Sequence, residues 1–315
     1  MLLFPGQGTQ RTGMGQALFH GFDEAAATLA GAAAITGRDL GALMRRGPSS
    51  VLTRTGSAQV AVTTVSLAAL AVLRARAVAY DAVAGHSVGM LAALAAADVL
   101  DPADAIALAA RRGTIMDALP LGGSMVSVAG LASPIAVDVV RMVRRRTGSA
   151  VVVGLVNGPQ NVVVSGEEAG VAEAVRALHE AGSSSAVPLT VSHAFHSPLM
   201  SGARPAWQDV VAAQPLRNAR IPVLADSTGE PLISQRAIRE FLVEQLTSPV
   251  RWDLVCRHLC ASGEREAIEM GDSKALRSLG LPYEQLRVTT MAAPQFLASL
   301  RDPGRTPLRL AGRTI

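Results

Sequence analysis

The chain has 315 residues, of which 49% are hydrophobic and only 3% aromatic. This length allows one large domain, or a large domain with a small one, and the core must be built mainly from Ala, Val and Leu. A net charge of +4 with an isoelectric point near 9.8 is moderately basic, without the dense patterning of nucleic-acid binders. We therefore expect no nucleic-acid partner, but an acidic protein or an anionic substrate.

The sequence also argues against disulfides, metal sites and membrane spans. Cys256 and Cys260 lie four residues apart in a predicted helix, where they are expected to be packing residues rather than a redox pair or a metal site. Residues 1–4 are too short and lack the basic start of a signal peptide. The apolar stretches at 60–73 and 88–100 are rich in Ala and interrupted by polar residues, as in core helices. We expect a cytoplasmic protein without membrane association.

The first part of the chain alternates predicted strands and helices. Residues 1–4 are predicted to form a strand that enters a turn at 5–8, and a helix is expected over 58–76. A strand at 81–84 then leads into a sharp turn at 85–89 and a helix from residue 90. The pair Asp101-Pro102 opens a further helix that extends to about residue 119.

Residues 123–191 have a different pattern. Strands are predicted at 125–129, 150–156, 162–165 and 185–191, and helices at 135–146 and 167–181. This order, βαββαβ, is the split pattern of a ferredoxin-like domain. We therefore expect a small domain at 123–191 inserted into a larger α/β domain made of residues 1–122 and 192–315.

The segment after residue 191 returns to α/β patterning. Strands are predicted at 221–224 and 267–270, and helices at 234–245 and from Trp252 to Ser262. The tail after Pro303 is polar and rich in arginine, and we expect it to be loosely held.

The motif G-H-S-V-G at residues 85–89 is the strongest chemical signal. It stands between a predicted strand and an Ala-rich helix, which is the context of a nucleophile elbow. Its two glycines permit a turn that side chains would crowd. Ser87 is left at the tip of this turn, beside a helix N-terminus whose free N–H groups can face an oxyanion. A chance match in a loop would lack this strand–turn–helix context.

A serine nucleophile needs a base, and His196 is the best candidate among the six histidines. His193 and His196 lie together where the chain leaves the predicted small domain, and a junction between domains is a usual place for a ligand. His86 is adjacent to Ser87, so its side chain is expected to point elsewhere and to be structural. A structural role for His196 is the alternative.

Arg112 lies in the middle of the apolar stripe of the helix that begins at Pro102. A guanidinium that points into the interior is costly unless it meets an anion. Either a protein carboxylate pairs with Arg112, or the carboxylate of a substrate does. The turn after the first strand, P-G-Q-G at residues 5–8, lacks the lysine and spacing of a phosphate loop. Gln7 in this turn and the N–H of Val88 are candidates for an oxyanion hole.

These motifs together give the chain a family resemblance. It resembles malonyl-CoA:acyl carrier protein transacylases and the acyltransferase domains of polyketide synthases. The matching pieces occur in family order at residues 4–10, 58–59, 85–89, 112–113, 156–161, 193–196 and 248–252. The resemblance implies an α/β-hydrolase-like core with a parallel sheet and a ferredoxin-like insertion, which agrees with the βαββαβ pattern.

The resemblance also implies roles for individual residues. Ser87 is the acylated nucleophile, His196 is a base oriented by backbone carbonyls, and Arg112 is the clamp for the malonyl carboxylate. The remaining implied residues are Gln7 and the Val88 amide in the oxyanion hole, with Gln59, His193, Phe195 and Asn157 in the substrate pocket. The substrates are malonyl-CoA and a phosphopantetheinyl carrier protein, with no bound cofactor and no metal.

The motif H-A-F-H at 193–196 resembles the form associated with selection of malonyl rather than methylmalonyl groups. In this resemblance Phe195 would narrow the space beside the α-carbon of the acyl group. Two positions depart from many relatives. Met90 stands where a Glu is frequent, and residues 271–273 replace a Gly-Pro-Gly turn. Neither touches the expected chemistry, but both leave the subgroup open.

We expect the partner to be an acidic acyl carrier protein and the chain to be a monomer. Four arginines on the helix at 135–146 could bind this partner, although a solvated basic face is an equal alternative: Arg141, Arg144, Arg145 and Arg146. Other functions remain open. One is an esterase that uses Ser87, Asp226 and His258, and another is a docking module without catalysis. A third is a related transacylase, either the malonate decarboxylase subunit or a transferase of larger acyl groups.

Overall fold

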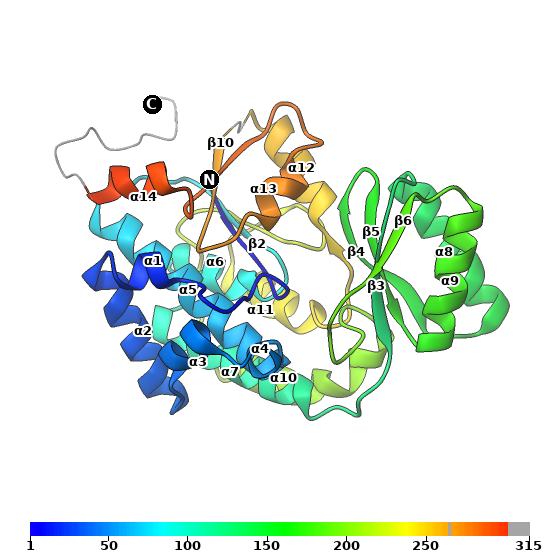
Figure 1. Cartoon of the computed structure of the whole chain (residues 1–315), viewed down its shortest axis with the longest axis horizontal. Coiled ribbons are helices and arrows are strands. Elements are labelled where there is room, and N and C mark those ends of the chain that lie inside the picture. Colours follow the sequence, from blue (N-terminus) through cyan, green and yellow to red (C-terminus); the bar gives the residue numbers. More distant parts are fainter. Residues whose placement is uncertain (264–265, 302–315) are drawn as a thin grey trace.

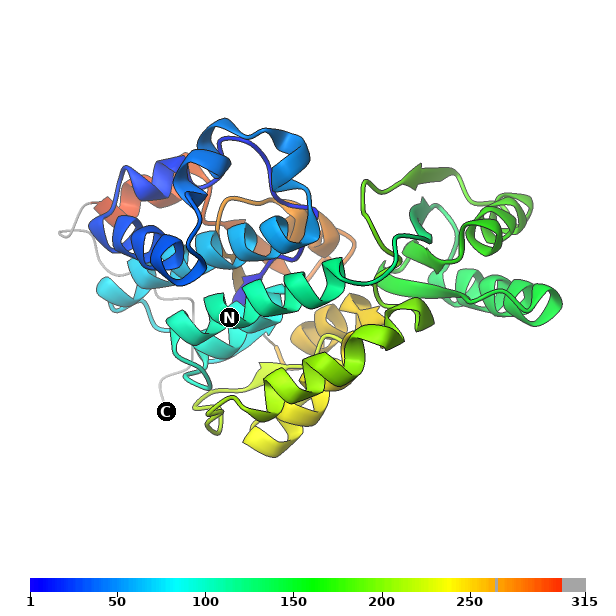
Figure 2. The same cartoon turned by 90° about the horizontal axis from the view of Figure 1, so that it is seen from below.

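The computed structural model describes residues 1–263 and 266–301. They form a mixed α/β fold with two sheets, one of six strands and one of five. Figures 1 and 2 show the smaller sheet and its two helices on one side of the molecule, and the remaining elements on the other. The expected loose tail after Pro303 lies outside the described residues.

The larger sheet has the strand order β11-β10-β1-β2-β7-β8. Its parallel strands are β1 (Leu2–Phe4), β2 (Val83–Gly85), β7 (Val223–Leu224), β10 (Glu266–Glu269) and β11 (Arg287–Thr290). The edge strand β8 (Pro231–Leu232) is antiparallel to β7. Because β1 and β2 are buried and adjacent, the turns that follow their carboxyl ends lie side by side.

Helix α6 (Gly89–Ala96) packs directly on β1 and β2, and the two longer helices α5 (Thr55–Ala75) and α7 (Pro102–Asp117) pack against α6 and against each other. Helix α5 is long and apolar enough to cross a membrane by composition, but 94% of its most apolar window is buried inside the protein. This burial is typical of a core helix, as the sequence pattern predicted. Its Ala, Val and Leu side chains join one large hydrophobic core with the sheet.

Several helices were not predicted from the sequence. Near the N-terminus these are α1 (Gln16–Phe19), α2 (Asp23–Thr36), α3 (Leu40–Arg46) and α4 (Ser49–Leu52). Further along are η1 (Pro198–Ala203), α10 (Arg204–Ala212), α13 (Ala275–Gly280) and α14 (Pro294–Arg301). The two predicted helices of this region are present as α11 (Gln235–Glu244) and α12 (Trp252–Ala261).

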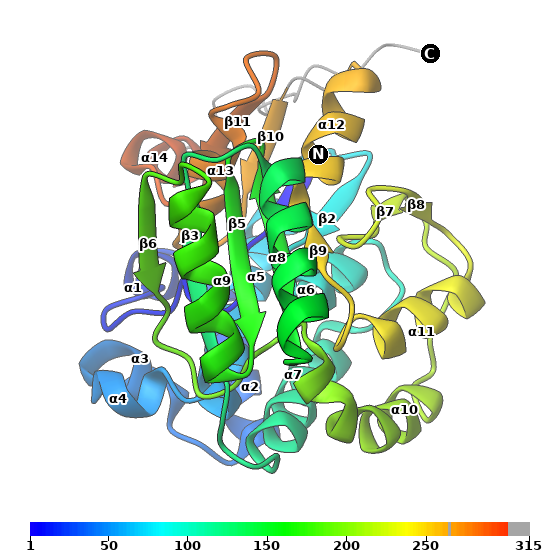
Figure 3. The ribbon, with the colours of Figure 1, turned by 90° about the vertical axis from the view of Figure 1, so that its right-hand side faces the viewer.

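The smaller sheet has the order β6-β3-β5-β4-β9. Its elements follow the predicted βαββαβ order: β3 (Ser124–Ala129), α8 (Ser133–Thr147), β4 (Val151–Gly158), β5 (Asn161–Gly166), α9 (Glu168–Glu180) and β6 (Ser185–Pro188). Figure 3 shows α8 and α9 side by side over one face of this sheet. Valines from the sheet and both helices form a second, separate core. Strand β9 (Val250–Arg251) comes from a distant part of the chain and pairs with β4, which the sequence did not predict.

Candidate active site

Ser87 lies in the turn between β2 and α6, as the motif predicted. Its φ angle of +52° is in the left-handed region, which is strained for a residue with a side chain. The glycines on either side are required by close backbone contacts. A Cβ at Gly85 would lie 2.2 Å from the N atom of Met90, and one at Gly89 would lie 2.2 Å from the carbonyl oxygen of Phe4. The turn is therefore pressed against β1, with Val88 as the N-cap residue of α6.

His196 is the hydrogen-bond partner of Ser87. The Oγ atom of Ser87 lies 2.8 Å from Nε2 of His196, whose side chain is buried. The other ring nitrogen, Nδ1, lies 3.1 Å from the carbonyl oxygen of Gln245 and 3.0 Å from that of Ser248. Carbonyl oxygens only accept hydrogen bonds, so Nδ1 carries the proton and Nε2 is free to accept from the serine hydroxyl.

The charge state of His196 follows from its surroundings. Burial and, to a smaller extent, the positive charge of Arg112 together lower the pKa of His196 to about 3. The imidazole is therefore neutral at neutral pH. A neutral imidazole beside a serine hydroxyl is the form that can take up a proton, so this pair has the geometry of a nucleophile and its base.

Arg112 is a buried cation with free donors. Its side chain is 2% exposed, and one terminal nitrogen donates to Oε1 of Gln59 at 3.0 Å. Among the described residues, Nε and the second terminal nitrogen have no hydrogen-bond partner. Burial lowers the pKa of Arg112 to about 10, which leaves it protonated at neutral pH. Within residues 1–263 and 266–301 no carboxylate is hydrogen-bonded to Arg112, although the negative charge of Asp226 favours its cationic form. Arg112 therefore keeps two nitrogens that could bind the carboxylate of a substrate.

Two further residues lie directly beneath Ser87: Asp226, which the sequence analysis named only in the alternative esterase triad, and Gln245, which it did not name. Asp226 is fully buried, and its Oδ2 accepts a hydrogen bond from the backbone N–H of Ser87 at 2.8 Å. The side-chain amide of Gln245 donates to the same oxygen at 3.0 Å and to the carbonyl oxygen of Ser87 at 3.1 Å. No local motif marks either residue, but Asp226 follows a strand that neighbours β2, which is the one signal that could have indicated it.

The alternative triad of Ser87, Asp226 and His258 is not assembled. In the part of the chain that the structure describes, no hydrogen bond joins His258 to either of the other two residues. His258 lies on α12, whereas Ser87 is already paired with His196.

The turn that contains Gln7 lies against the elbow. A Cβ on the neighbouring Gly6 would lie 2.5 Å from the carbonyl oxygen of His86. The side-chain amide of Gln7 donates to Oγ1 of Thr55 at 3.4 Å, so this side chain is tied to α5. The backbone groups of the turn and the N-terminus of α6 therefore meet next to Ser87, which is the arrangement that an oxyanion hole requires.

The other predicted residues have different surroundings. Asn157 contacts His86 rather than Ser87, with 3.1 Å between its Oδ1 and the Nε2 of His86, whose ring packs on Trp252. His193 is buried, and its ring nitrogens lie 2.8 Å from Oγ of Ser192 and 3.2 Å from the carbonyl oxygen of Leu119. Phe195 is buried beside it, with 6.1 Å between the two ring centres. His86 therefore has the structural surroundings that we expected.

No cluster of three or more His, Cys, Asp or Glu side chains suited to a metal ion occurs within residues 1–263 and 266–301. The chemistry that the site offers is carried by an alcohol, a neutral imidazole, a buried cation and backbone N–H groups. This set suits acyl transfer through a serine ester to or from a substrate that carries an anion.

Comparisons with known proteins agree with this chemistry. The chain is 35% identical over 286 residues to the malonyl CoA-acyl carrier protein transacylase of Bacillus subtilis (strain 168), covering 88% of both proteins. It is 35% identical over 312 residues to polyketide synthase GfsB of Streptomyces halstedii, covering 97% of this chain but 6% of that protein. A solved malonyl-transacylase in complex with a type II polyketide acyl-carrier protein superimposes with a TM-score of 0.91 at 31% identity, covering 95% of this chain and 97% of that one. The family model of the acyl transferase domain matches residues 1–273, and the chain belongs to this family.

Proposed function

We propose that this protein transfers a malonyl group from coenzyme A to the phosphopantetheine thiol of an acyl carrier protein, for fatty acid or polyketide synthesis. The observation that carries the proposal is the buried Arg112, with two unpartnered nitrogens close enough to His196 to lower its pKa. A malonyl thioester brings the carboxylate that these donors lack, and acetyl does not. The names of the relative from Bacillus subtilis and of the solved carrier-protein complex support the same substrates.

In the first half-reaction the malonyl carboxylate binds Arg112. Nε2 of His196 takes the proton of the Ser87 hydroxyl, and Oγ attacks the thioester carbon. The tetrahedral oxyanion is held by the backbone N–H groups of Val88 and Gln7, because the Gln7 side chain already donates to Thr55. The C–S bond then breaks, and the CoA sulfur leaves with the proton from His196.

In the second half-reaction the carrier thiol replaces CoA. His196 takes the thiol proton, the sulfur attacks the malonyl-serine ester, and Ser87 leaves with the proton returned by His196. Water must be excluded between the two halves, because hydrolysis would release free malonate. The same backbone N–H groups hold the oxyanion in both half-reactions.

We assign selection of the acyl group to residues around His196. Phe195 is buried next to it, and its carbonyl oxygen accepts from Oγ of Ser165 at 2.7 Å, which fixes the backbone of the motif. A ring at this position leaves little room for a substituent at the α-carbon. Gln59 orients Arg112 by accepting a hydrogen bond from it. His193 and Asn157 lie at the border of the pocket, where His193 contacts Ser192 and Asn157 contacts His86.

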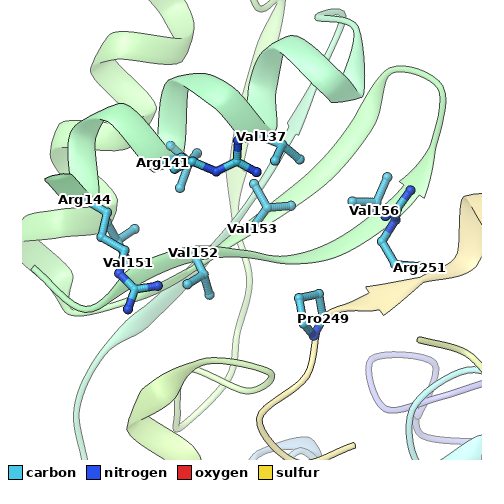
Figure 4. A pocket seen from close by; sticks show the side chains of 10 residues that line it. Val137, Arg141, Arg144, Val151, Val152, Val153, Val156, Pro249 and Arg251 are labelled. Carbon is cyan, nitrogen blue, oxygen red and sulfur yellow. The ribbon is translucent and has the colours of Figure 1, made fainter. Parts of the chain in front are cut away.

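The lining of one pocket supports a carrier-protein surface that uses two of the four arginines on α8. Arg141 and Arg144 line a pocket together with valines of α8 and β4, Pro249 and Arg251 (Figure 4). Its volume is about 230 Å³. Arg145 and Arg146 do not line this pocket. We propose that an acidic carrier protein contacts Arg141 and Arg144, and that the adjacent Ser248–Pro249 segment connects this surface to His196.

The finer organisation is also part of this proposal. Residues 1–122 and 192–315 correspond to an α/β-hydrolase-like domain, and residues 123–191 to a ferredoxin-like domain. The separate valine core and the strand order β6-β3-β5-β4 support the second assignment. We further propose that the protein acts as a monomer in the cytoplasm.

Mass spectrometry of the protein mixed with malonyl-CoA tests the central step. We expect one malonyl group on the peptide that contains Ser87, and its transfer to a holo carrier protein but not to an apo one. Ser87→Ala should remove the adduct, whereas the control Ser133→Ala, a buried serine bonded to Gly158, should retain it. A protein that takes up no malonyl group, or takes it up with Ala at position 87, contradicts the mechanism.

A further inference from the structure

Asp226 occupies a place that the proposed mechanism does not use. Strands β2 and β7 pair in parallel, with Ala84 opposite Leu224. Ser87 and Asp226 each follow the carboxyl end of one of these strands, so the sheet brings the acidic side chain directly under the elbow. Its carboxylate does not touch either ring nitrogen of His196, which bond to Ser87 and to two backbone carbonyls.

The contacts of Asp226 are directed at the backbone of Ser87. Oδ2 accepts from the Ser87 N–H at 2.8 Å, while the amide of Gln245 bridges the same oxygen and the carbonyl oxygen of Ser87. The carbonyl oxygen of Gln245 also accepts from His196. Asp226 and Gln245 thus form one network that holds the nucleophile by its peptide groups and the base by its ring.

This network holds a strained conformation at a cost in stability. Ser87 has φ +52°, which the side chain disfavours, and His196 has φ +56°. Asp226 is fully buried, and its Oδ1 has no hydrogen-bond partner among the described residues. Burial raises the pKa of Asp226 to about 7, so the fold disfavours the charged form of this side chain. A buried acid that is only partly satisfied is expected to be destabilising, so its bond to Ser87 points to a role in the site.

We propose that Asp226 is a positioning residue, which fixes Ser87 in its left-handed conformation so that Oγ faces Nε2 of His196. The inference rests on the proposed role of Ser87 as the nucleophile. It assigns to Asp226 the acceptance of the hydrogen bond from the Ser87 N–H, not proton transfer and not contact with substrate. The acceptor, rather than the negative charge, is what Ser87 requires.

Three variants separate these roles. Asp226→Ala and Asp226→Leu remove the acceptor, and the Leu side chain keeps a similar volume in case the Ala variant does not fold. Asp226→Asn keeps an acceptor oxygen for the Ser87 N–H and removes the charge. We expect the single-turnover rate of malonyl-Ser87 formation to fall about 10- to 100-fold in the Ala and Leu variants and to stay within about threefold in the Asn variant. The malonyl-CoA concentration that half-saturates this single-turnover rate should be unchanged, because Arg112 is intact.

The final fraction of acylated protein distinguishes positioning from folding. A loss of stability lowers the fraction of protein that is acylated after long incubation, whereas poor positioning lowers the rate and leaves the end point unchanged. Glu269→Ala is a matched control, because Glu269 is also buried and accepts from backbone N–H groups, those of Leu276 and Arg277 at the start of α13. It should alter stability without altering the rate per acylated site.

The variants test the positioning role of Asp226, and the wild-type protein tests the proposed role of Ser87. A folded Ala or Leu variant that is acylated at the wild-type rate overturns the inference, and so does an Asn variant as slow as the Ala variant. If the wild-type protein itself takes up no malonyl group on Ser87, the proposed function fails instead, and this is seen before any variant is compared.

Discussion

Replacement of Arg112 by methionine separates binding from stability, because the two effects have opposite signs. Met has a similar length but no donors. Arg112 offers two unpartnered nitrogens to a substrate carboxylate, and a hydrogen bond to a charged group contributes about 1.5–3 kcal/mol. Loss of two such bonds corresponds to about 3–6 kcal/mol, a fall of about 10²- to 10⁴-fold in kcat/KM for malonyl-CoA. Acetyl-CoA lacks the carboxylate, so its kcat/KM should not fall, and it should rise because loss of the cation makes His196 a stronger base.

The same substitution should stabilise the fold. Burial lowers the pKa of Arg112 to about 10, although the negative charge of Asp226 opposes this shift, so the folded state disfavours the cation that it holds at pH 7. Removing this charge contributes stability, while the oxygen of Gln59 loses its donor. We expect a net increase of about 1–2 kcal/mol in the free energy of unfolding.

Kinetics with malonyl-CoA and acetyl-CoA on one preparation, together with urea unfolding, measures both effects. The reasoning requires a collapse of the malonyl to acetyl ratio in a protein that is at least as stable as the wild type. A variant that keeps this ratio refutes the role of Arg112 as the carboxylate clamp. A variant that loses both activities and unfolds more easily shows that Arg112 is structural.

Four further predictions follow from the same geometry. Because the pKa of His196 is lowered to about 3, the rate of malonyl-Ser87 formation should stay level from pH 8 to about pH 5 in quenched-flow measurements, and an acid limb centred near 6.5 would contradict a neutral buried base. Because the pKa of Asp226 is raised from 3.8 to about 7, its ionisation destabilises the fold at high pH. Asp226→Asn should therefore raise the free energy of unfolding by about 4 kcal/mol at pH 8, and this gain should vanish towards pH 4. A Cβ at Gly154 would lie 2.9 Å from Cβ of Ser165 and 3.4 Å from the carbonyl oxygen of His196, so Gly154→Ala should cost about 1–3 kcal/mol and lower kcat. Gly158→Ala on the same strand is the control, since its added Cβ would meet no atom within 4 Å, and equal effects in stability and steady-state assays would count against the prediction. Arg144→Glu should raise the KM for the carrier protein about tenfold at low salt without changing that for malonyl-CoA, whereas Arg145→Glu outside the pocket should not.

Parts of this site could be predicted from sequence because local geometry restricts them. The turn at 85–89 needs glycine at positions 85 and 89, because a Cβ there would lie 2.2 Å from a backbone atom. The two fixed glycines make the motif recognisable in the sequence. Arg112 was found by helical periodicity, since one cation in an apolar stripe must point inward. The order of elements in 123–191 could also be predicted, because its amphipathic helices and its valine-rich strands have clear hydrophobic periodicity.

The parts of the site that could not be predicted from the sequence depend on contacts between distant segments of the chain. Asp226 lies 139 residues from Ser87 and Gln245 lies 158 residues from it, and neither side chain has a local pattern that differs from a surface residue. The carbonyl of Ser248 orients His196 without any side-chain signal at all. The short helices α1, α3 and α4 were not predicted, because four to seven residues are too few to show a helical period.

The clamp and the base are linked through charge. Arg112 lowers the pKa of His196, so the imidazole is a weak proton acceptor while the cation is uncompensated. A malonyl carboxylate on Arg112 offsets that positive charge and therefore raises the basicity of His196 at the moment when the thioester is in place. An acetyl group brings no such compensation. Selectivity for malonyl then acts on the rate of acylation as well as on binding, and the preference should appear in kcat and not in KM alone.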